Sequence, residues 1–196
     1  MNHEIQAYSR ELRKELDNLH NISEILRDDI QSLIDTYQND FKNQTLRRAL
    51  IRAIWAYIEG NVHALQCYTL RACELGGKDI PIDDRKILSE STIIVNVNGV
   101  AEIQNLWADT LTKIKKTLKI SCELTGFSWR PDFNDNKWNQ LCKSIQDRHR
   151  LTHPRKSNNL GVSDEELNDT LAGLEWFVIT INEFQIKSCE HFGVIL

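Results

Sequence analysis

The sequence is poor in the two residues that most often interrupt regular structure, with 8 glycines and 3 prolines among 196 residues. This scarcity argues against a β-sandwich and against a disordered chain, and it favours helices. The cysteines do not suggest a disulfide framework either, because there are five of them, an odd number, and no two are spaced as C-x-x-C. We therefore expect neither a disulfide scaffold nor a zinc site, and we expect a reducing compartment.

Long hydrophobic runs are also lacking. No stretch approaches the roughly 18 apolar residues of a membrane-spanning helix, and residues 1–16 are charged from the start, without the apolar core of a signal peptide. These absences predict a cytoplasmic protein that does not associate with a membrane. The 41% of hydrophobic residues can fill one substantial core, and 196 residues fit a single domain.

Hydrophobic residues recur at steps of three and four along most of the chain, which is the spacing of amphipathic helices. The pattern predicts one long helix or two stacked helices over 3–38, and further helices over 43–74, 105–124 (with Trp107 on its apolar side) and 135–151. A last helix is expected to begin at Ser163. The fold class is therefore mainly α.

Several local signals refine these helices. Ser163 with Glu166 three residues later has the pattern of a capping box, in which each side chain accepts a backbone N–H of the first turn. Gly60 interrupts the most apolar helix at a cost of about 1 kcal/mol relative to alanine, and it would let a neighbouring helix come close. The pair at 76–77, both glycines, is typical of a helix end.

One segment has the composition of β-structure. Thr92, Ile93, Ile94 and Val95 are β-branched, and Asn98-Gly99 is the preferred sequence of a two-residue hairpin turn. The segment predicts a short hairpin near 91–104. A loop at a helix boundary is the alternative.

Charge is unevenly distributed on a chain whose formal net charge is −4. Residues 1–40 hold nine acidic and four basic side chains, and residues 163–190 hold seven acidic and one basic. Between them, 143–156 carries five basic side chains against Asp147 alone, and two histidines. The overall balance argues against a surface that coats nucleic acid indiscriminately. The basic segment is either a solvated helix end or an anion-binding site.

The end of the helix over 135–151 carries the residues with the most chemical potential: Arg148, His149 and His153. Histidine moves protons near neutral pH, and arginine offers a planar fork to phosphate oxygens. RNA carries its own nucleophile, the 2′-hydroxyl, so an enzyme that cuts RNA needs no metal to supply one. On a regular helix, residues five apart lie about 140° from each other. Arg148 and His153 therefore meet only if the helix unwinds before Pro154 or if a second copy of the chain completes the site.

The two histidines also allow a metal-binding interpretation. His149 and His153 are four residues apart and could share a metal, but no third ligand stands at a familiar spacing and the neighbouring arginines would repel a cation. We therefore expect no metal and no cofactor.

Glu59 is a further candidate, because it is a carboxylate in the most apolar helix. It is either an exposed or salt-bridged surface residue or a partner that orients Arg148 or His153.

The run from Asp147 to Arg155 (DRHRLTHPR) resembles the R-x4-6-H motif of HEPN domains. The context agrees, because an apolar helix with the string 52–60 (RAIWAYIEG) precedes it and a capped helix follows it. The similarity covers roughly residues 43–190, with 1–40 as an N-terminal helical extension. In one departure from the pattern, His149 replaces the commoner asparagine after the arginine.

The resemblance implies a bundle of about five helices, with the hairpin as an insertion, and a symmetric homodimer that brings two motifs into one cleft. Many HEPN proteins cut RNA without a metal, as toxins of toxin–antitoxin pairs or as phage-defence effectors. Carried over, Arg148 would hold the scissile phosphate, His153 would act as general base or acid, and His149 would assist. The substrate would also meet Arg150, Arg155 and Lys156.

Three functions are therefore weighed. The first is a metal-independent endoribonuclease, regulated in some settings by an antitoxin or another protein. The second is a non-catalytic HEPN-like dimeric module that binds RNA, a nucleotide or a protein partner. The third is a helical adaptor in which the Arg148/His153 pair is coincidental.

Overall fold

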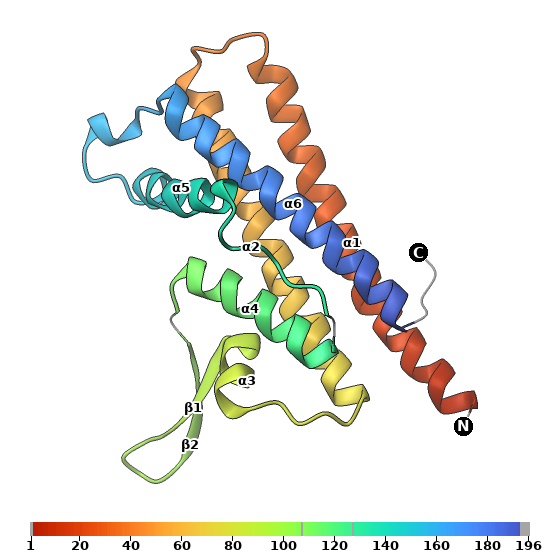
Figure 1. The fold of residues 1–196 in the computed structure, drawn as a ribbon. Coiled ribbons are helices and arrows are strands. Elements are labelled where there is room, and N and C mark those ends of the chain that lie inside the picture. Colours follow the sequence, from red (N-terminus) through yellow and green to blue (C-terminus); the bar gives the residue numbers. More distant parts are fainter. Residues whose placement is uncertain (1, 107, 127, 193–196) are drawn as a thin grey trace. The chain divides into compact units, whose positions relative to one another are not determined.

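The computed structural model describes residues 2–106, 108–126 and 128–192. Over these residues the chain is mainly helical and carries one two-stranded antiparallel sheet (Figure 1). The expected fold class is thereby confirmed. In chain order the elements are α1 (Asn2–Tyr37), α2 (Gln44–Leu75), α3 (Ile82–Ser89), β1 (Ser91–Val95), β2 (Ala101–Asn105), α4 (Thr110–Thr125), α5 (Asn136–Thr152), the 3-10 helix η1 (Ser157–Leu160) and α6 (Asp164–Phe192).

The helix ends follow the local signals closely. The capping box before α6 is present, because the Ser163 N–H donates to the Glu166 carboxylate at 2.8 Å and the Glu166 N–H donates to Ser163 Oγ at 3.2 Å. Helix α2 ends at Leu75, and the turn after it contains Gly77, whose φ of +60° lies in the left-handed region that glycine adopts freely. Helix α4 begins later than expected, after Asp109, whose carboxylate accepts the Thr112 N–H at 2.9 Å. Trp107, which the prediction included, lies outside the described residues.

Residue contacts gather the chain into two compact units. The first unit comprises the described parts of 1–19, 62–130 and 186–196, and the second comprises 20–61 and 131–185. Helices α1, α2 and α6 each contribute residues to both. The basic segment at the end of α5 belongs to the second unit, so that unit carries the candidate site.

The first unit holds a core cluster of buried apolar residues and a set of buried polar contacts. This core cluster consists of Cys73, Ile80, Ile87, Leu88 and Ile120. Helices α2 and α4 are also joined through buried side chains, because the Thr69 and Ser121 hydroxyls lie 2.7 Å apart and Gln66 donates to Thr117 Oγ1 at 3.3 Å. A buried hydroxyl pair, Tyr68 and Ser188, joins α2 to the end of α6.

The hairpin of the first unit is present but its turn differs from the prediction. Strands β1 and β2 pair in an antiparallel register with Ile93 opposite Ile103, as Figure 1 shows. The Asn96 N–H donates to the Val100 carbonyl at 2.9 Å, so residues 97–99 form a three-residue loop rather than a two-residue turn. Within this loop only Gly99 has a positive φ, +75°, which matches a loop that closes on a left-handed glycine. The Asn96 Oδ1 atom accepts hydrogen bonds from the N–H groups of residues 98 and 100. These two bonds explain why the longer loop is stable.

Helix α3 is an element that the periodicity did not reveal. It has only eight residues, with Asp83 and Asp84 in its first turn, where negative charge is favourable. It ends at Ser89, and the capping residue after it, Glu90, adopts a left-handed φ of 50°. Ile87 and Leu88 are its buried residues, and two such positions are too few for a helical pattern to stand out in the sequence.

The second unit is built on close helix packing and a cluster of aromatic rings. The ring centroids of Trp138 on α5 and Trp176 on α6 lie 4.8 Å apart. At Gly173, an added Cβ would come within 2.8 Å of the Leu141 backbone, so α5 and α6 approach each other as only glycine permits. Gly60 has the role expected of it, because a Cβ there would meet the Leu26 side chain of α1 at 3.0 Å.

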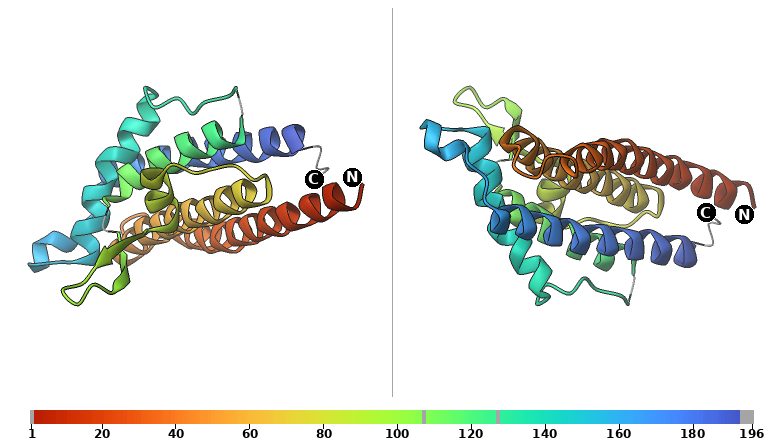
Figure 2. Two further views of the ribbon diagram at one scale, coloured as in Figure 1. Left: turned by 90° about the horizontal axis from the view of Figure 1, so that it is seen from below. Right: turned by 90° about the horizontal axis from the view of Figure 1, so that it is seen from above.

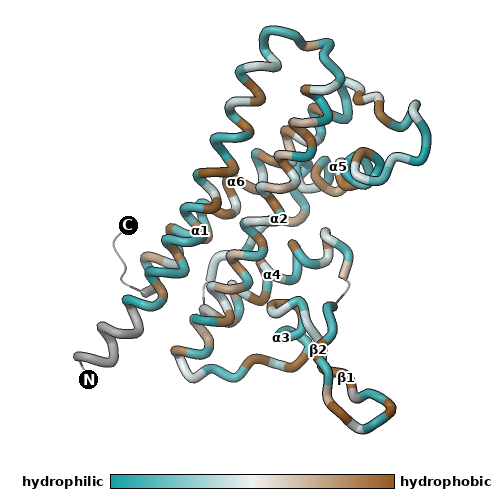
Figure 3. The backbone as a smooth tube through the Cα atoms, turned by 180° about the vertical axis from the view of Figure 1, so that it is seen from behind, coloured by the Kyte–Doolittle hydropathy of each residue, from teal (hydrophilic) through white to brown (hydrophobic). Residues whose placement is uncertain are grey.

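The segment between α5 and α6 completes this unit. In both views of Figure 2 the chain leaves the end of α5, passes through η1 and returns to the start of α6. Figure 3 shows that this connection is largely hydrophilic. Among the helices over the described residues, none combines the length and the apolar character that crossing a bilayer requires.

Candidate functional site

The candidate site begins with the way α5 ends. His149 and Arg150 lie in its last turn, where positive charge is favourable beside the exposed carbonyls. Pro154 disfavours helical geometry at the residue before it. His153 accordingly leaves the helix, with φ −126° and ψ 62°, while its N–H still donates to the His149 carbonyl at 2.9 Å.

This ending brings the two motif residues to one place. Arg148, His149, His153 and Arg155 all line an open pocket of about 540 Å³ in the second unit. Arg148 and His153 therefore line the same pocket within a single chain.

Arg148 is held from α2. Its Nη2 donates to both carboxylate oxygens of Glu59, at 2.9 and 3.0 Å, and the arginine side chain is 24% exposed. Glu59 is thus salt-bridged, and its partner is the motif arginine. Both contacts use the same terminal nitrogen, so Glu59 does not engage Nη1 or Nε of Arg148. The carboxylate fixes the guanidinium at the pocket and offsets part of its charge.

A second residue of α2 supports the same helix end, and sequence reasoning missed it. Arg52 Nη2 donates to the Leu151 carbonyl at 2.6 Å, which satisfies one of the last carbonyls of α5. Arg52 and Glu59 are seven residues apart on α2 and so lie on one face. The seven-residue spacing of these two oppositely charged side chains was the signal available in the sequence.

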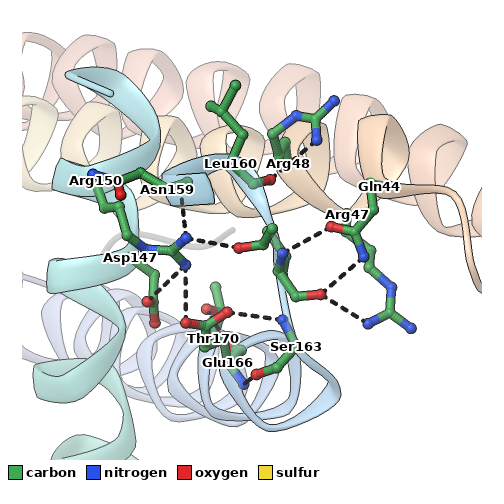
Figure 4. Close-up of polar contacts among 12 residues, drawn as sticks. Gln44, Arg47, Arg48, Asp147, Arg150, Asn159, Leu160, Ser163, Glu166 and Thr170 are labelled. Atoms are coloured by element: carbon green, nitrogen blue, oxygen red, sulfur yellow. Dashed lines mark hydrogen bonds and ion pairs between the residues drawn. The ribbon is translucent and has the colours of Figure 1, made fainter. Parts of the chain in front are cut away.

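Arg150, expected to bind substrate, lines the same pocket, and its guanidinium is also engaged by groups of the protein. Nη1 donates to the carbonyls of Asn159 and Gly161 at 2.6 and 2.7 Å. Nη2 contacts the Asp147 carboxylate at 3.2 Å and the Glu166 carboxylate at 2.9 Å. All four terminal N–H groups thereby have acceptors within the protein, as the dashed lines from Arg150 show (Figure 4).

The two carboxylates around Arg150 are close enough to affect each other. The pKa of Asp147 is raised to about 6: burial is the largest cause, the charge of Glu166 adds to it, and the hydrogen bond from Arg150 opposes the rise. Sequence reasoning placed Glu166 in the capping box but did not pair it with Asp147. The pairing depends on a contact between α5 and α6 that no local pattern reports.

The other residues expected to bind substrate are accessible. Arg155 lines the pocket, and Arg155 and Lys156 are both exposed on the segment that follows α5. Among the described residues, no group of three or more histidine, cysteine or acidic side chains is placed to hold a metal ion. The arrangement is therefore a cationic pocket with two imidazoles.

No family model matches the chain, and comparison with curated proteins and with solved structures gives no match. The HEPN resemblance accordingly rests on the motif at 147–155 and on the order of the helices around it.

Proposed function

We propose that this protein is a metal-independent endoribonuclease of the HEPN type, acting in the cytoplasm as a toxin or a phage-defence effector. The observation that carries the proposal is that Arg148, His149 and His153 line one open pocket of a single chain. A fixed cation beside two imidazoles suits the cleavage of a phosphodiester that brings its own nucleophile.

The reaction needs two proton transfers and one site of charge stabilisation. One histidine takes the proton of the RNA 2′-hydroxyl as its oxygen forms a bond to phosphorus. The bond from phosphorus to the 5′-oxygen breaks, and a second imidazole gives that oxygen a proton. The products are a 2′,3′-cyclic phosphate and a 5′-hydroxyl end. His153 is the general base or acid, and His149 supplies the complementary transfer.

The remaining residues act on the phosphates or on the catalytic groups. Arg148 holds the scissile phosphate through the nitrogens that Glu59 does not engage, and Glu59 is a positioning residue for that guanidinium. Arg155 and Lys156 contact neighbouring phosphates from the exposed segment after α5. Arg150 contributes indirectly, because it holds the 159–161 backbone at the pocket edge.

Partners follow from the same proposal. RNA is the substrate, and a homodimer would place two such pockets in one assembly. The acidic composition of residues 1–40 suits a basic regulatory protein, such as an antitoxin. Because a single chain already unites Arg148 and His153, the dimer is no longer needed to explain how these residues meet.

The proposal is tested by incubating purified protein with RNA in EDTA. We expect cleavage that leaves 2′,3′-cyclic phosphate ends. His153→Ala and Arg148→Ala should each lower the rate by about a hundredfold or more, the scale of a lost acid–base or charge-stabilising group. His20→Ala, which removes an exposed histidine of α1, is the matched control and should retain full activity. Unfolding curves establish that each variant is folded.

A second candidate function is RNA binding without cleavage. The Arg148–Glu59 ion pair favours it, because the carboxylate already offsets part of the charge of the Arg148 guanidinium that would stabilise the reacting phosphate. The same experiment separates the two. Cleavage that persists in both variants would rule out the assigned residues, and RNA that binds to the wild type but stays intact would favour the binding module.

A further inference from the structure

The backbone between α5 and α6 is held more firmly than a surface connection requires. Four consecutive carbonyls, from residue 159 to residue 162, each accept a hydrogen bond from an arginine or glutamine side chain (Figure 4). Arg150 donates to the carbonyls of Asn159 and Gly161, and Arg48 Nη1 donates to the Leu160 carbonyl at 3.1 Å. Surface loops are normally among the more mobile parts of a protein, so this anchoring calls for a reason.

The carbonyl of residue 162 is held twice. Gln44 and Arg47 each donate to the Val162 carbonyl at 3.1 Å, and Gln44 Oε1 accepts the Val162 N–H at 2.7 Å. Arg47 is itself buried and also donates to the Phe41 carbonyl at 2.9 Å. Side chains from two helices, α2 and α5, therefore fix this short stretch of backbone.

The fixed backbone presents Asn159 to the pocket. Asn159 lines the pocket that also contains Arg148 and His153. The contacts that hold it use its backbone: its carbonyl accepts from Arg150 at 2.6 Å, and its N–H donates to the Lys156 carbonyl at 3.0 Å. Its carboxamide is not needed to hold the loop.

A second carboxamide lines the same pocket. Gln146 lies on α5 two residues before Arg148, and its side chain is exposed. A carboxamide carries no charge and adds little to the stabilisation of a phosphate. It does place a donor and an acceptor side by side, which matches the edge of a nucleobase, with adenine as the common partner. Proteins that recognise single-stranded RNA read unstacked bases along such edges.

We propose that Asn159 and Gln146 read the base of the nucleotide beside the phosphate bound at Arg148, which makes the pocket selective for RNA sequence. This inference rests on the proposed RNA substrate and specifies how the site chooses it. It also explains the anchoring of residues 159–162, because a hydrogen-bonding pair discriminates between bases only when its backbone is held in place.

The first test measures binding of four short RNA strands that differ in one central base. All carry 2′-O-methyl groups, which block the attack of the 2′-oxygen and keep the strands intact. We expect the wild type to prefer one base. Asn159→Ala should reduce that preference by about tenfold, the scale of one amide–base pair, and Gln146→Ala should reduce it in the same direction.

Asn158→Ala is the matched control. Asn158 is the same residue type in the same 3-10 helix, and it is exposed. It should keep the wild-type preference. Equal binding of the four strands by the wild type, or a preference that survives in both Asn159→Ala and Gln146→Ala, would overturn the inference.

The second test repeats the comparison with unmodified strands and maps the cut sites. We expect cuts beside the preferred base in the wild type and dispersed cuts in Asn159→Ala. Base-selective binding without any cutting would support the base reading and remove the proposed nuclease activity. Cutting without base preference would support the nuclease activity and remove the base reading. The two proposals therefore fail in different ways.

Discussion

Arginines of the second unit carry out different tasks although the sequence presents them alike. Arg148 pairs with the Glu59 carboxylate, Arg150 has all four terminal N–H groups engaged, and Arg52 caps the end of α5. Arg155 remains exposed at the pocket. A count of positive charges in residues 143–156 therefore overstates the charge available to a ligand, because part of it is matched by carboxylates and carbonyls.

Asp147 provides a prediction at the same scale. Its pKa is raised to about 6, so between about pH 4 and about pH 6 the folded protein binds a proton that the unfolded chain has lost. The contribution of Asp147 to stability therefore falls as pH rises through this window. We expect Asp147→Asn to gain stability relative to the wild type on going from about pH 4 to about pH 7, measured by denaturant unfolding at both values.

Glu166→Gln is a second test of the pH dependence that we attribute to Asp147. Glutamine can still take part in the capping box, but it removes the charge that helps to raise the pKa of Asp147. The pH dependence of the wild type should become smaller in this variant. A stability difference between Asp147→Asn and the wild type that is the same at both pH values would contradict the explanation.

At the scale of elements, the crossing of α5 and α6 depends on one glycine. Alanine is normally the better helix residue by about 1 kcal/mol. At Gly173, however, the added Cβ would lie 2.8 Å from Leu141 Cα, a backbone atom that cannot move without shifting α5. We expect Gly173→Ala to lower the free energy of unfolding by about 1–3 kcal/mol, the usual cost of overpacking, as measured by denaturant unfolding.

Gly161→Ala is the control for that substitution. A Cβ at Gly161 would meet no atom within 4 Å, and its φ of −70° suits alanine. The change should leave stability unchanged or raise it slightly, because it restricts the unfolded chain. If Gly173→Ala proved as stable as the wild type, the close approach of the two helices would not be rigid.

The hairpin illustrates a different limit at this scale. Its strands were anticipated from β-branched residues, but Ile93 and Ile103 are 71% and 77% exposed, so they do not contribute to the core cluster. Its turn was misassigned because Asn98-Gly99 is compatible with both loop lengths. The Asn96 side chain decided the outcome by accepting two N–H groups of the loop.

At the scale of the whole molecule, the question is whether one chain forms a complete site. Arg148 and His153 line the same pocket of one chain. We therefore expect that mixing the inactive Arg148→Ala and His153→Ala variants restores no RNA cleavage, even when light scattering shows that they form mixed dimers. Recovered activity would mean that the two residues combine across copies, as in the cleft that the HEPN resemblance implies.

Much of this protein follows from the sequence alone. Periodicity, the Ser163–Glu166 capping box and the double glycine after α2 located the long helices, because each depends on residues within a few positions of one another. The same holds for the departure of His153 from the helix, which Pro154 dictates. The composition also predicted a mainly helical chain.

Tertiary structure decided the rest. It determined that Glu59 faces Arg148, that Arg150 holds a loop, that Asp147 lies beside Glu166 and that Asn159 reaches the pocket. Each of these is a contact between residues from different elements, set by how helices pack rather than by local spacing. Local patterns identify which side chains carry chemistry, whereas packing determines which of them remain available for it.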